Sequence, residues 1–118
     1  MEVIGRIKMI GAIQDVSASF KKREIVKSKV EQYFLENADY FINNKDVVNW
    51  EKEHIVNTGT QVMCKHWNIS QNCGGFVDAV VANDLHKATG SADYVNQYAL
   101  RFYCAMIYNL GIPSELVT

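Results

Sequence analysis

The sequence predicts a mainly β domain that ends in an α-helix. Residues 2–14 are rich in Val and Ile and alternate in part, and residues 60–70 alternate clearly. Such alternation is typical of half-buried strands, because successive side chains of a strand point to opposite faces. Residues 91–110 form a longer apolar segment with capping residues near both ends, which indicates a helix.

The first two predicted strands form a long hairpin. In residues 2–14, Arg6 and Lys8 fall on the outward face, and four apolar side chains fall on the other face: Val3, Ile7, Met9 and Ile13. Residues 14–19 are polar and predict the connection, and residues 20–30 resume a strand. The start of this second strand is basic and contains Lys21, Lys22 and Arg23.

The middle of the chain is predicted in less detail. Residues 31–44 suit either a strand or a short helix, and Asp46 could cap a short helical turn that ends before a turn at residues 58–59. Residues 60–70 then form a strand with Lys65 and Trp67 on one face.

The last third contains one open choice and one clear helix. Residues 76–86 have apolar spacing that fits a helix and a β-branched run that fits a strand, so periodicity alone does not decide between them. Residues 91–110 have Ser91 as the candidate N-cap and Gly111 just past the end. This helix is apolar nearly all round, so we expect it to pack on the rest of the domain or to mediate self-association.

Composition narrows the class of protein. The chain has 118 residues, of which 48% are hydrophobic, which fits one domain with a real core and not a disordered chain. No apolar run reaches the roughly 18 residues of a membrane span, and the start lacks the layout of a signal peptide. Three irregularly spaced cysteines do not form a disulfide framework. We therefore expect a cytoplasmic protein.

The net charge of −1 hides an uneven distribution. Residues 1–29 contain seven basic and three acidic side chains, a net charge of +4. Residues 30–118 contain five basic and ten acidic side chains, a net charge of −5. The first quarter of the chain therefore offers a local positive field to a polyanion.

Several features of the first 26 residues occur together: a glycine after the first strand residues, a Gln-x-Val-Ser connection at 14–17 and Phe-Lys-Lys-Arg-Glu at 20–24. This combination resembles a family of short OB-like proteins from Bacteroidetes bacteria and their phages, which are similar to single-stranded-DNA-binding proteins. A looser likeness continues to residue 86 through residues 59–70 and 74–84, the latter resembling a closing strand.

The resemblance implies a five-stranded OB-like barrel over residues 1–88, with residues 76–86 as a strand. The C-terminal helix predicted within residues 89–118 lies outside the resemblance and is an addition to this barrel. The resemblance also implies a protein without enzymatic activity that binds single-stranded DNA with little sequence preference and supports DNA replication or recombination. The expected partner is therefore a single-stranded nucleic acid and not a membrane.

Single-strand binding needs cations for the phosphates and aromatic faces for the bases. Phe20 and Trp67 either supply such faces or pack into the core, as aromatic side chains at strand spacing often do. The predicted nucleic-acid-binding residues are Arg6, Lys8, Phe20, Lys21, Lys22, Arg23, Lys65 and Trp67.

Two alternatives stay open. Residues 70–73 carry no positive charge where the family has a basic loop, which favours a structural or interaction protein, of phage or host origin, on the same barrel. Residues 72–77 resemble the nucleophile segment of NlpC/P60-like cysteine hydrolases, with Cys73 as the nucleophile. Cys64, His66 and Cys73 offer at most three ligands to zinc, so we expect no metal and no cofactor.

Overall fold

The chain is almost entirely helical. The computed structural model describes the backbone of residues 2–70 and 74–117 and the side chains of residues 19–70 and 74–117. Its elements are α1 (Glu2–Phe41), α2 (Lys45–Trp50), α3 (Lys52–His66), α4 (Gly75–Val81), α5 (Leu85–Ser91), α6 (Tyr94–Asn109) and the 3-10 helix η1 (Ser114–Leu116). These described ranges contain no strand, so the prediction of a mainly β, OB-like barrel is wrong.

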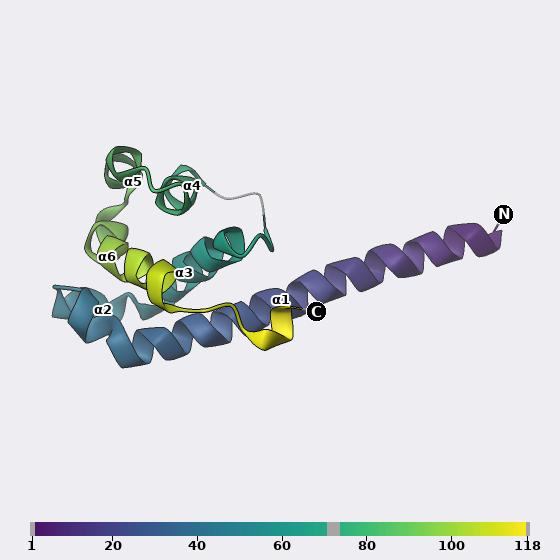
Figure 1. The fold of residues 1–118 in the computed structure, drawn as a ribbon, viewed down its shortest axis with the longest axis horizontal. Coiled ribbons are helices and arrows are strands. Elements are labelled where there is room, and N and C mark those ends of the chain that lie inside the picture. Colours follow the sequence, from purple (N-terminus) through teal and green to yellow (C-terminus); the bar gives the residue numbers. More distant parts are fainter. Residues whose placement is uncertain (1, 71–73, 118) are drawn as a thin grey trace.

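The longest element is α1. Its 40 residues span roughly 60 Å at 1.5 Å per residue, and the molecule itself is 59 Å long. The first half of α1 extends away from the other helices, and its second half lies along them (Figure 1). Both predicted hairpin strands, residues 2–14 and 20–30, lie within this one helix, so the hairpin prediction is also wrong.

From residue 19 onward, the buried side chains of α1 and just past its end recur every fourth residue, which places successive members on neighbouring parts of one helix face. They are Val26, Val30, Phe34, Ala38 and Ile42. The window 20–30 contains only the first two, which are too few to separate a helical period from a strand period. The remaining members lie in residues 31–44, which the sequence left undecided.

The central helix is α3, which packs against α1, α4 and α6. Because neighbours cover it on several sides, most of its second half is buried, including Thr60 and the consecutive residues Val62, Met63 and Cys64. A helix of this kind lacks the one-sided apolar stripe of a surface helix. The predicted turn at residues 58–59 and the predicted strand over 60–70 are therefore wrong, since α3 runs through to His66.

Two asparagines follow the ends of α3 and α4. Asn68 and Asn83 have φ angles of 63° and 60°, in the left-handed region that asparagine tolerates after a helix. Beyond Asn83, the backbone N–H of Asp84 donates to the carbonyl of Ala79 at 2.9 Å. The contested residues 76–86 are thus α4, a turn and the start of α5, and the strand assignment is wrong.

The predicted helix over residues 91–110 is confirmed as α6. Its N-cap is Asp93, whose Oδ1 accepts a hydrogen bond at 2.7 Å from the backbone N–H three residues later, and not Ser91, which ends α5. The helical turn predicted upstream is present as α2, with Asn44 as its N-cap in place of Asp46.

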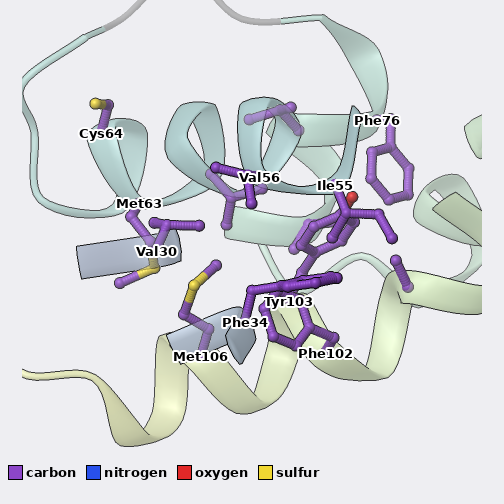
Figure 2. Close-up of a cluster of buried hydrophobic side chains, with 14 of the residues drawn as sticks. Val30, Phe34, Ile55, Val56, Met63, Cys64, Phe76, Phe102, Tyr103 and Met106 are labelled. Atoms are coloured by element: carbon purple, nitrogen blue, oxygen red, sulfur yellow. The ribbon is translucent and has the colours of Figure 1, made fainter. Parts of the chain in front are cut away.

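The core lies where α1, α3, α4 and α6 meet (Figure 2). The ring of Phe102 in α6 meets the ring of Phe34 in α1 edge to face, with 5.8 Å between centroids. Gly59 allows α3 to approach α1 closely, because a Cβ at this position would lie only 2.9 Å from Cγ1 of Val30.

Candidate nucleic-acid interface

Four of the predicted binding residues lie together on α1, just before Val26, the first buried position among its described side chains. We call residues 20–23 the basic segment. Phe20 is 63% exposed, and the side chains of Lys21, Lys22 and Arg23 are exposed as well. Phe20 is therefore not part of the core, and its ring is exposed to solvent.

Two hollows lie along the seam between α1 and α3. Their α1 walls are formed mainly by residues four apart, which lie on one side of the helix: Ser19, Arg23, Lys27 and Glu31. The first hollow has a volume of about 220 Å³. Its α1 wall is formed by Ser19, Phe20 and Arg23, and its opposite wall, at the end of α3 and just beyond it, is formed by Cys64, Ile69 and Ser70.

The second hollow, of about 300 Å³, is lined by Lys27 and Glu31 from α1 and by residues from the first half of α3: Lys52, Glu53, Val56 and Asn57. In it, Nζ of Lys52 lies 3.0 Å from Oε1 of Glu31. Positive and negative side chains are therefore mixed in the second hollow. The first hollow is lined by one charged side chain, that of Arg23.

The basic segment differs from the lysines on α3 in its ion pairing. Among the described side chains, ion pairs join Lys52 to Glu31, His54 to Asp93 and Lys65 to Asp78, and none of them includes a residue of the basic segment. Its three positive charges are therefore not compensated by an ion pair with a described residue.

Lys65 and Trp67 lie at the end of α3 and are engaged within the bundle. Nζ of Lys65 is 2.9 Å from Oδ1 of Asp78, and the Lys65 side chain is 25% exposed. Trp67 is half-buried and packs against the hydrophobic core. The neighbouring Ile69 and Ser70 line the first hollow, so the fold brings this end of α3 beside the basic segment.

Other predicted site residues fall outside this description. The side chains of Arg6 and Lys8, and all of Cys73, lie outside the described residues. Cys64 is buried, whereas His66 is exposed. No group of three His, Cys, Asp or Glu side chains that could hold a metal ion is present among the described residues.

The sequence prediction missed two cations along the seam, Lys27 on α1 and Lys52 on α3, and only Lys27 belongs to the row of residues four apart. A spacing of four from Ser19 through Arg23 to Lys27 is a helical signal that the printed sequence does contain. A strand assignment hides it, because strand neighbours on one face are two apart.

Comparison of the chain with protein families, curated proteins and solved structures found no match. None of the helices, as far as they are described, is long and apolar enough to cross a membrane. The chemistry of the described side chains is therefore the basis for assigning a function.

Proposed function

We propose that the protein binds single-stranded nucleic acid, without enzymatic activity, through the basic segment and the first hollow. The observation that carries the proposal is the exposed run of Phe20 and three cations on α1. Cations attract phosphates by releasing counterions, and an exposed ring can stack on any base. Neither contact depends on base identity, so we expect little sequence preference.

The charge distribution supports this location for the strand. Residues 1–29 carry a net charge of +4, and the rest of the chain carries −5. A polyanion is attracted to the start of α1 and repelled by the remaining helices. We therefore expect the strand to follow α1 and the first hollow and not to wrap around the bundle.

A single strand is favoured over a duplex by the exposed ring. Phe20 can reach a base face only when that base is not stacked within a helix. Arg23 lines the first hollow together with Phe20, so we expect Arg23 to contact the phosphate beside the stacked base.

The test is fluorescence anisotropy of a labelled oligo-thymidine titrated with the protein at several salt concentrations. Three phosphate contacts on a single strand predict a slope of about −2 for log K against log salt concentration. Replacing Lys21, Lys22 and Arg23 together with alanine should bring this slope close to zero. Phe20→Ala should weaken binding by about 1–3 kcal/mol and leave the slope unchanged.

The matched control replaces Lys45 and Lys87, which are exposed on α2 and α5, with alanine. This variant loses charge away from the basic segment and should bind as the wild type does. Absence of binding at low salt would show that the proposal is wrong and would favour the interaction-protein alternative. Equal affinity for duplex DNA would refute the single-strand part of it.

A further inference from the structure

Exposed aromatic side chains collect where α2 meets the start of α6. Trp50 is 79% exposed and Tyr94 is 65% exposed. The Tyr94 ring meets the Tyr98 ring edge to face, with 5.4 Å between centroids. Clustered exposed apolar surface often marks a binding site, because leaving it in water is unfavourable.

Trp50 and Tyr94 line a hollow of about 190 Å³, which we call the α2–α6 pocket. Its other walls are Val47 and two acidic residues, Asp46 and Glu51. Neither carboxylate takes part in an ion pair formed by the described side chains, and no Lys or Arg of the described chain lines the pocket. The pocket thus combines aromatic rings with uncompensated negative charge.

The adjacent surface already holds a cation over aromatic rings. The guanidinium carbon of Arg101 lies 5.7 Å from the ring centroid of Tyr40 and 5.5 Å from that of Phe41. Arg101 is three residues beyond Tyr98 on α6, so the two side chains are neighbours. The α2–α6 pocket also has aromatic rings, together with two carboxylates, but no described Lys or Arg side chain occupies it as Arg101 occupies the surface of Tyr40 and Phe41.

We infer that the α2–α6 pocket binds an ammonium group, as carried by a lysine side chain or by a quaternary ammonium compound. An ammonium group is attracted both to aromatic faces and to carboxylates, whereas a neutral group of the same shape gains only apolar contact. The pocket is smaller than the roughly 300 to 1,000 Å³ of sites for drug-sized ligands, which suits a head group. This inference does not depend on the basic segment.

The test is a titration of the isotope-labelled protein with tetramethylammonium chloride, followed by NMR. The backbone amide signals of α2 and of the first turn of α6 should shift saturably, and sodium chloride at equal ionic strength should not reproduce the shift. Asp46→Asn combined with Glu51→Gln keeps the pocket volume and should weaken binding roughly threefold to tenfold, as should Trp50→Leu.

Matched controls are Glu24→Gln, an exposed carboxylate on α1, and Tyr108→Leu, an exposed ring near the other end of α6. Both should bind tetramethylammonium as the wild type does. Choline and its neutral isostere 3,3-dimethyl-1-butanol, in which carbon replaces the charged nitrogen, are compared in the same way. An equal response to these two compounds, or no saturable shift with tetramethylammonium, would overturn the inference. Titration with N-acetyl-lysine amide and with its trimethylated form then distinguishes the two sources of the ammonium group. Tighter binding of the trimethylated compound indicates a quaternary ammonium ligand, and tighter binding of the unmodified compound indicates a lysine side chain.

Discussion

Replacing Gly59 with alanine tests how closely α3 packs on its neighbours. The added Cβ would lie 2.9 Å from Cγ1 of Val30 and 3.1 Å from Cε of Met106. The terminal methyl of Met106 can move aside, but Val30 is fully buried and its branched side chain has one strongly preferred rotamer in a helix. Overpacking costs about 1–3 kcal/mol, and removing a helical glycine offsets about 1 kcal/mol. Gly59→Ala should therefore lower the free energy of unfolding by about 1 kcal/mol.

Urea unfolding followed by circular dichroism measures this change. Gly90→Ala is the matched control, because an added Cβ there meets nothing within 4 Å, and it should raise the free energy of unfolding by about 0.5–1 kcal/mol. In a double-mutant cycle, Val30→Ala should remove the cost of Gly59→Ala, because the clashing methyl group is gone. If Gly59→Ala stabilises the protein as Gly90→Ala does, the close approach of α3 to α1 is refuted.

Two further substitutions test hydrogen bonds of α6 by the same urea titration. Tyr103→Phe removes the 2.6 Å bond that Tyr103 donates to the buried Asn96 and should cost about 1–3 kcal/mol. Burial raises the pKa of Tyr103 well above its ordinary value of 10. Because Tyr103 then ionises in the unfolded chain before it does so in the folded protein, the wild-type free energy of unfolding should fall as the pH rises above 10. Tyr103→Phe should lack the part of this decrease that comes from Tyr103. Asp93→Ala removes both the N-cap of α6 and the 2.9 Å contact with His54 and should cost about 1–2 kcal/mol; Asp84→Ala, which uncaps the short α5, should cost less.

The parts of the fold that were predicted correctly have local signals. α6 is bounded by polar capping residues and by Gly111, and these features act within one helical turn of the chain. The short helix α2 was recognised for the same reason, although its cap was assigned two residues too late. Such signals need no knowledge of the rest of the molecule.

The errors over residues 20–30 and 60–70 concern segments whose conformation depends on distant packing. Val and Ile are compatible with a helix and favoured in a strand, so residues 2–30 satisfy both descriptions. Within this stretch, Val26 and Val30 are buried in the shared core, and Gly59 lets α3 pack closely against Val30. That contact joins residues nearly thirty positions apart, which no window of the sequence contains.

The same distinction applies to the candidate sites. The sequence by itself determined the charge asymmetry and the basic segment, because the order of charged residues along the chain does not depend on the fold. Only the tertiary structure decided that Lys65 is paired with Asp78 while the basic segment is exposed. Only the tertiary structure also placed Trp50 and Tyr94 in one pocket. Ion pairs, burial and cavities depend on which helices pack together, and that packing is set by contacts between residues far apart in the chain.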